Sequence, residues 1–133
     1  MAAKLPPERE LLAALNSLVH FQTEYWLYVE PKRAVKLWAH FRDRVEEVIA
    51  EISDPVEFAK ATERVRLTDE HILSPAWERI RLEDFALLDR ADVSKEKWWY
   101  WLDLAKAGRL AVKPGPVTKQ PKPAAPAPAA PAA

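Results

Sequence analysis

The chain has 133 residues, 20 basic and 20 acidic side chains, no cysteine and only two glycines. The absence of cysteine excludes disulfides, thiolate zinc sites and cysteine nucleophiles, and two glycines are too few for a glycine-rich phosphate loop or a nucleophile elbow. No apolar run approaches the ~20 residues of a membrane-spanning helix, and the N-terminus lacks the apolar segment of a secretory signal, so we expect a cytoplasmic protein.

Two long helical patterns occupy the first part of the chain. After two prolines, residues recur at helical spacing in a predicted seam of Leu12, Leu15, Val19, Gln22, Trp26 and Val29. A polar residue in such a seam, here Gln22, more often fixes helix register or partner choice than performs chemistry. Pro31 ends this helix and opens the next, whose inward residues are predicted to be Ala34, Trp38, Phe41, Val45, Val48 and Ile52.

Proline also marks the beginning of the third and fourth predicted helices. Asp54 is a predicted N-cap before Pro55, and we expect this third helix to run to about Leu67. Ser74 and its following proline repeat that signal and begin a fourth helix, which we expect to reach about Ala91.

The fifth predicted helix covers residues 95–107 and contains the aromatic run. Ser94 is its expected N-cap, Val93 and Trp98 would form a hydrophobic staple, and Gly108 would end it. The sequence therefore predicts an all-α fold, a small bundle of about five helices in a domain spanning residues 1–112.

Residues 113–133 differ from the rest in composition. They contain three lysines and no acid, so residues 1–112 carry 17 basic against 20 acidic side chains. Seven of the twelve prolines lie from Pro114 onward, with many alanines and no aromatic residue. Such a segment buries too little surface to offset its ordering entropy, so we expect a disordered tail over residues 113–133.

Four consecutive aromatic residues, Trp98 to Trp101, make the fifth helix unusual. On a helical wheel at about 100° per residue, Trp98, Trp101 and Leu102 share one side, while Trp99 lies about 100° away. Apolar residues cover most of the circumference, which is typical of a helix that is central in a core or meets a second surface. Since a domain of five short helices has little room for a surrounded helix, we expect Trp99 or Tyr100 to serve a contact outside the core.

We consider four interpretations of this aromatic helix. The tryptophans can simply complete a small helical core, or they can form a protein interface, where Trp and Tyr are enriched. They can also stack bases of single-stranded nucleic acid, although the mildly acidic body disfavours phosphate binding. A membrane-surface helix is the fourth reading, but no strongly basic face opposes the tryptophans. The predicted interface residues are Lys95, Trp99, Tyr100 and Lys106.

Catalytic and metal-binding patterns are weak. His20 with Glu24 and His40 with Asp43 are spaced for one helix face each, so a metal site shared by two helices is geometrically conceivable. A metal site needs at least three converging ligands, and no HExxH motif is present, so we expect no metal, no cofactor and no enzymatic activity.

The sequence resembles no family that we can name. It favours a non-catalytic helical interaction module, an accessory subunit or adaptor, that binds a protein partner or itself through the aromatic helix. The alternative is an accessory protein that binds single-stranded nucleic acid by aromatic stacking.

Overall fold

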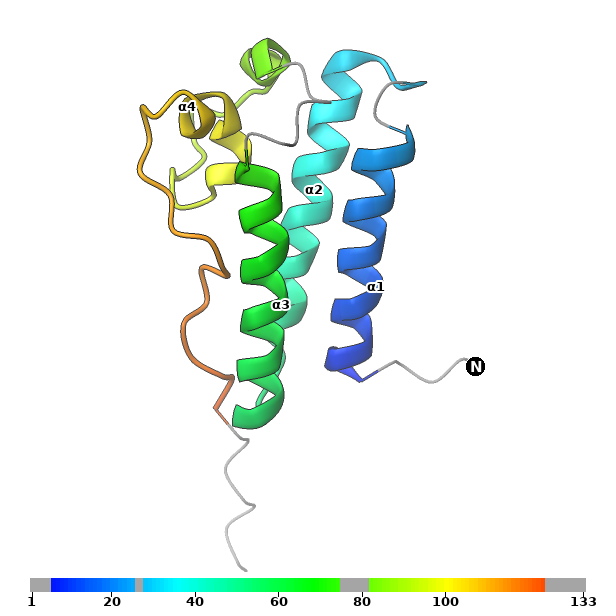
Figure 1. Cartoon of the computed structure of the whole chain (residues 1–133), viewed down its shortest axis with the longest axis vertical. Coiled ribbons are helices and arrows are strands. Elements are labelled where there is room, and N and C mark those ends of the chain that lie inside the picture. The colour runs from blue at the N-terminus through cyan, green and yellow to red at the C-terminus, as the bar shows by residue number, and fades with distance from the viewer. Residues whose placement is uncertain (1–5, 26–27, 75–81, 124–133) are drawn as a thin grey trace, which may run out of the picture.

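The computed structural model describes residues 6–25, 28–74 and 82–123, and these ranges contain helices and loops but no strand (Figure 1). The α-helices are α1 (Pro7–His20), α2 (Pro31–Ile49), α3 (Pro55–Leu73) and α4 (Leu102–Lys106). A π-helical turn, Phe21–Tyr25, continues α1, and two 3-10 turns cover Leu82–Leu87 and Trp98–Trp101. The all-α prediction is confirmed.

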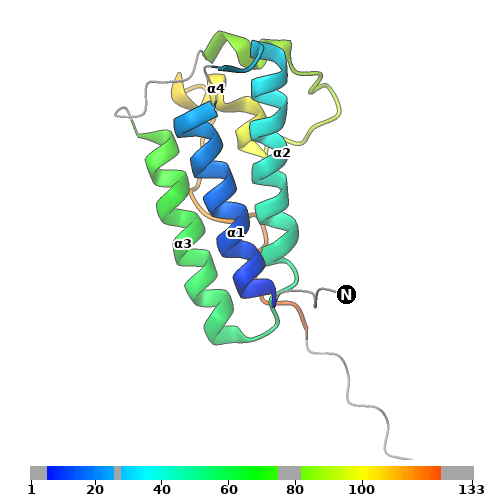
Figure 2. The ribbon, with the colours of Figure 1, turned by 90° about the vertical axis from the view of Figure 1, so that its right-hand side faces the viewer.

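Helices α1, α2 and α3 run up, down and up, each beginning at a proline (Figure 1). Proline suits the first helical position because its missing N–H would have no partner there and its φ angle is already helical. Helix α1 lies on one side of the α2–α3 pair, and the chain after α4 descends on the other side (Figures 1 and 2). Helix α4 and the two 3-10 turns gather at the end of the bundle where α2 begins and α3 ends.

The core consists of two apolar clusters stacked along the bundle. The first joins the start of α2 and the end of α3 to the aromatic turn, and includes Trp38, Phe85, Trp98, Trp99 and Leu102. The second joins the other ends of α1, α2 and α3, and includes Leu11, Val45, Ile49, Phe58 and Val65. Between them along the helices lie two buried charged residues, Arg42 on α2 and Asp69 on α3.

The inward stripe of helix α1 matches the predicted seam only in part, and Trp26 of that seam lies outside the described residues. Its buried residues are Leu11, Ala14, Leu15 and Leu18, while Leu12 and Val19 are 38% and 40% exposed. The prediction is confirmed for Leu15 and wrong for Leu12 and Val19, because apolar residues at helical spacing occur on two stripes of this helix and the pattern alone does not choose between them. Gln22 is buried as predicted, and its Oε1 accepts a hydrogen bond of 3.0 Å from Trp38 Nε1.

Helix α3 continues six residues beyond the predicted end at Leu67, to Leu73. Asp54 caps it as predicted, accepting from Val56 N at 3.3 Å. Of the predicted fourth helix, residues 75–81 lie outside the described residues, and the following part forms the 3-10 turn Leu82–Leu87. The fifth helix is shorter than predicted, because its helical turns begin at Trp98 rather than after Ser94.

The predicted tail divides into two parts. Residues 113–123, here called the strap, lie against α2 and α3, with Gly115 and Pro116 buried. The domain boundary expected between residues 112 and 113 is therefore corrected, since the strap supplies backbone hydrogen-bond donors to the buried side of the bundle. Residues 124–133 lie outside the described residues, and disorder there stays a prediction.

Candidate functional site at the aromatic turn and the strap

The aromatic run forms one 3-10 turn, Trp98–Trp101, that leads directly into α4. Trp98 and Trp99 are both buried, and their rings meet edge to face with centroids 5.9 Å apart. Gly108 follows the end of α4 with a φ of 73°, as a helix-ending glycine does, because a residue without a Cβ adopts that angle at little cost. The predicted helix end is confirmed.

Trp99 and Tyr100 both reach Asp43 on α2. Trp99 is fully buried, and its Nε1 donates to Asp43 Oδ1 at 2.9 Å. The Tyr100 hydroxyl donates to the other oxygen of the same carboxylate. Burial and then the Asp43 carboxylate raise the pKa of the Tyr100 hydroxyl, so this group remains a hydrogen-bond donor at neutral pH. The exposed contact predicted for Trp99 is therefore wrong.

The local geometry explains this correction. A 3-10 turn advances by about 120° per residue, so Trp98 and Trp101 share a direction and Trp99 turns further than an α-helical wheel assumes. In this orientation Trp99 lies against α2 rather than at the edge of the domain, and Arg42 Cζ lies 4.4 Å from its ring centroid. Residues 95–97 form turns instead of helix, so the predicted α-helical wheel over residues 95–107 does not describe the start of this segment.

The two predicted lysines have separate environments. Lys106 Nζ donates to the carbonyl oxygens of Ile72 and Ser74 at 3.1 and 3.2 Å, and so pairs acceptors that the end of α3 leaves open. Lys95 is exposed, with Nζ 5.3 Å from the ring centroid of Trp101. The structure therefore joins Trp99 and Tyr100 at Asp43, places Lys106 at the end of α3, and leaves Lys95 at the surface.

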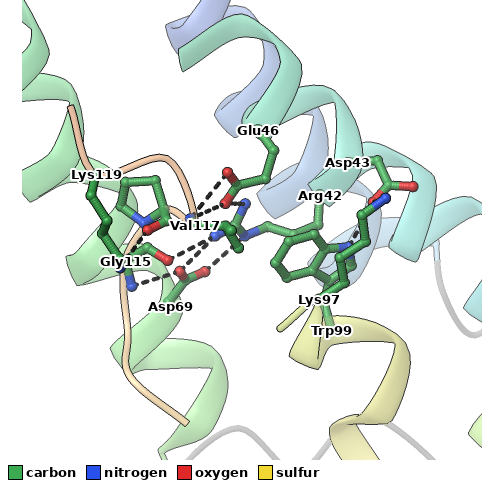
Figure 3. A network of polar contacts seen from close by, with 10 residues as sticks. Arg42, Asp43, Glu46, Asp69, Lys97, Trp99, Gly115, Val117 and Lys119 are labelled. Atoms are coloured by element: carbon green, nitrogen blue, oxygen red, sulfur yellow. Dashed lines mark hydrogen bonds and ion pairs between the residues drawn. The ribbon is translucent and has the colours of Figure 1, made fainter. Parts of the chain in front are cut away.

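A buried ionic network centred on Arg42 links α2, α3 and the strap (Figure 3). Arg42 Nε and Nη2 donate to the two carboxylate oxygens of Asp69 at 3.0 and 2.8 Å, a bidentate pair in which both side chains are fully buried. Its Nη1 donates to Glu46 Oε1 at 2.9 Å, one turn along α2. These two residues have the i,i+4 spacing at which opposite charges on one helix meet.

The strap completes this network with its backbone. Gly115 N donates to Asp69 Oδ2 at 3.0 Å, and Arg42 Nη2 donates to Gly115 O at 3.3 Å. Val117 N donates to both oxygens of Glu46, at 2.9 and 3.1 Å. Further along, Lys122 N donates to Ile52 O at 2.8 Å. Gly115 has a φ of 119°, which a residue with a Cβ adopts only with strain.

Burial and the neighbouring charges shift the pKa values of Arg42 and Asp69. Burial alone would lower the pKa of Arg42, but Asp69 and Glu46 outweigh that effect and the net shift is upward, so the guanidinium stays charged. Burial raises the pKa of the Asp69 carboxyl, and Arg42 and the Gly115 N–H oppose that rise. Two carboxylates face one guanidinium, and the backbone N–H groups of the strap supply the remaining donors.

Sequence reasoning missed this network although a signal for it exists. Arg42 lies on the buried stripe of α2, between Trp38 and Val45, and Asp69 lies on that of α3, between Val65 and Ile72. A positive and a negative residue, each inside the apolar stripe of a neighbouring helix, indicate a buried ion pair. The participation of Gly115 has no comparable signal, because it depends on where the chain returns after α4.

A groove lies between the aromatic turn and the strap. It encloses about 270 Å³, and its lining includes Lys95, Trp98, Val112, Lys113, Pro116 and Lys119. Three lysines and one acid, Glu96, border it. The indole N–H of Trp98 has no acceptor in the described part of the chain. We call this feature the strap groove; among the predicted interface residues, Lys95 alone lines it.

The histidines do not assemble a metal centre in the described residues. His20 and His40 are both exposed, and no group of three or more His, Asp or Glu side chains that could hold a metal ion occurs in residues 6–25, 28–74 and 82–123. None of the described helices is long and apolar enough to cross a membrane. No protein family model, curated protein or solved structure matches this chain.

Proposed function

We propose that this protein is a non-catalytic interaction module that holds an extended, acidic segment of a partner protein in the strap groove. The single observation that carries the proposal is the groove itself, where apolar Val112 and Pro116 lie beside three lysines. Apolar contacts supply affinity in such a site, and complementary charge supplies orientation and partner choice.

The ionic network supports this proposal because it holds one wall of the groove in place. Gly115 and Val117 are bound to Asp69 and Glu46 through their backbone N–H groups, which leaves their neighbours Lys113 and Lys119 at the surface. A wall already ordered before binding reduces the entropy cost of association. The same network uses the donors of Arg42 within the fold, so this guanidinium is a structural group in the proposal.

The nucleic acid alternative loses support at the residue on which it depended. Base stacking needs an open aromatic face, whereas Trp99 is fully buried and Tyr100 is partly buried. We therefore keep the protein partner as the proposed ligand.

Fluorescence anisotropy with two labelled decapeptides tests the proposal. One peptide alternates Glu with Leu, and the other alternates Lys with Leu. We expect the protein to bind the acidic peptide and not the basic one. Lys95→Glu should weaken that binding at least about tenfold, because it places a negative charge beside the acidic ligand.

Lys60→Glu is the matched control, since Lys60 is exposed on α3 and away from the groove, and the substitution changes the net charge by the same amount. Equal weakening by both substitutions would mean that only the overall charge matters and would contradict the proposal. A dissociation constant above about 1 mM for the acidic peptide would also contradict the proposal.

A further inference from the structure

The outward face of α1 combines exposed apolar residues with a long absence of charge. Between Glu10 and Glu24 the sequence contains no Asp, Glu, Lys or Arg, although 30% of the whole chain is charged. Six residues of this stretch of α1 are exposed, namely Leu12, Ala13, Asn16, Ser17, Val19 and His20. A solvated helix face of this length would ordinarily carry charges.

No described element covers this face, which points away from α2, α3 and the strap (Figure 2). Shallow hollows flank it on both sides. One, of about 290 Å³, lies between Ala13 and Ser17 of α1 and Phe41 and Arg44 of α2. Another, of about 180 Å³, lies between Leu12 of α1 and the Lys60 and Arg64 side of α3. Ridges of a further helix fit into grooves of this kind when helices pack.

We propose that this face of α1 pairs in antiparallel orientation with the same face of a second copy of this chain. Leu12 and Val19 are seven residues apart, about two turns, and so share one edge of the helix. An axis of symmetry near Asn16 then places Leu12 of each copy beside Val19 of the other. The two large apolar residues exposed on α1 are covered in this way, and Asn16 of each copy lies near the axis.

Charge complementarity at the ends of the helix favours this second copy and this orientation. At one end of the uncharged stretch Arg9 is exposed, while Glu10 beside it is paired with Arg44 of α2 at 3.3 Å; at the other end Glu24 is exposed. Antiparallel pairing brings Arg9 of one copy close to Glu24 of the other, twice in each dimer. Parallel pairing would instead place like charges together. Self-complementarity of one patch is what a two-fold interface requires.

The expected dimer is weak. Helix α1 has 14 residues, which corresponds to a length of about 21 Å, and one helix face of this length is smaller than a standard stable interface. We therefore expect the dimer to dissociate on dilution. The pairing is independent of the proposed function, because the strap groove lies on the opposite side of the bundle.

Single-cysteine variants test the pairing directly, since the full-length chain contains no cysteine of its own. Leu12→Cys and Val19→Cys are prepared with tags of different mass, mixed, and oxidised mildly. We expect the mixed disulfide dimer to make up well over the roughly one half of the dimeric product that random pairing of equal amounts gives, because the antiparallel register brings these two positions together. Ala59→Cys, exposed on α3, is the control and should remain mainly monomeric. A statistical mixture of products would overturn the proposal.

Sedimentation of the unmodified chain over a range of concentrations provides the second test. Ala13→Lys places a cation on the outward face of α1, and Ala59→Lys makes the same substitution at an exposed position of α3. We expect Ala13→Lys to raise the dimer dissociation constant at least tenfold and Ala59→Lys to leave it unchanged. A chain that stays monomeric at every concentration, or equal effects of both substitutions, would overturn the pairing.

Discussion

Trp99 joins three kinds of contact in one side chain. Its ring is fully buried, its N–H donates to Asp43, and the Arg42 guanidinium lies over its face. We expect Trp99→Ala to lower the free energy of unfolding by about 3–5 kcal/mol, the usual loss for a buried Trp. Trp98→Ala should cost a similar amount, because Trp98 is also buried. Urea unfolding followed by circular dichroism measures both losses.

Tyr28→Ala is the control for these substitutions, because Tyr28 is 85% exposed and its replacement should change the free energy of unfolding by less than about 0.5 kcal/mol. A loss below about 1 kcal/mol for Trp99→Ala would show that its ring is accessible in solution. The contact outside the core that the helical wheel predicted for Trp99 would then have to be tested by a binding measurement.

Single residues were predictable where a helix has one apolar stripe, as α2 has. Trp38 on α2 is buried as its spacing indicates, whereas the predicted seam of the first helix was right for Gln22 and wrong for Leu12 and Val19. Trp99 was not predictable, because its direction depends on a 3-10 turn whose start is fixed by contacts with α2. Proline and capping signals placed the beginning of each long helix, whereas the end of α3 lies six residues past the expected Leu67.

At the scale of elements, the composition of residues 113–123 predicted disorder, whereas these residues form the strap. The segment has few apolar side chains, so its burial could not be inferred from hydrophobicity. It is instead held through backbone N–H groups that donate to Asp69 and Glu46, and these carboxylates are positioned by α2 and α3. Hydrogen bonds to charged acceptors contribute more than neutral ones, which offsets part of the ordering entropy.

Two truncations separate the strap from the residues after it. Deletion of residues 113–133 should lower the melting temperature by several degrees, because Asp69 loses the Gly115 donor and Glu46 loses the Val117 donor. The loss of even one such donor costs about 1–3 kcal/mol when the acceptor is buried, and a loss of 1 kcal/mol shifts the melting temperature of a domain of this size by roughly 4–8 °C. Differential scanning calorimetry measures the shift.

Deletion of residues 124–133 is the matched control, since it removes none of the contacts described for the strap. We expect its melting temperature to equal that of the full chain. If both truncations melt at the same temperature as the full chain, the strap does not stabilise the bundle, and one wall of the strap groove is not fixed.

At the scale of the whole molecule, the Arg42–Asp69 pair separates the two apolar clusters of the core. Trp38 belongs to the first cluster and Val45 to the second, and Arg42 lies between them on the same stripe. A buried ion pair adds little net stability over apolar residues, since its desolvation offsets most of the attraction. Its contribution here is to bind the backbone of the strap, which an apolar pair at the same positions would not do.

A double-mutant cycle tests whether the pair acts as one unit. Arg42→Met should lower the free energy of unfolding by about 3–5 kcal/mol, because it leaves Asp69 buried without its cation. Asp69→Leu should also be costly, because Arg42 then lacks its bidentate partner and Gly115 N loses its acceptor. In the double variant neither charge is left unpaired, so its loss should fall short of the sum of the two single losses by more than about 1 kcal/mol. Additivity within about 0.5 kcal/mol would contradict this coupling. The strap should loosen at Gly115 in both variants that lack Asp69, and faster amide hydrogen exchange at Gly115 would report that loosening.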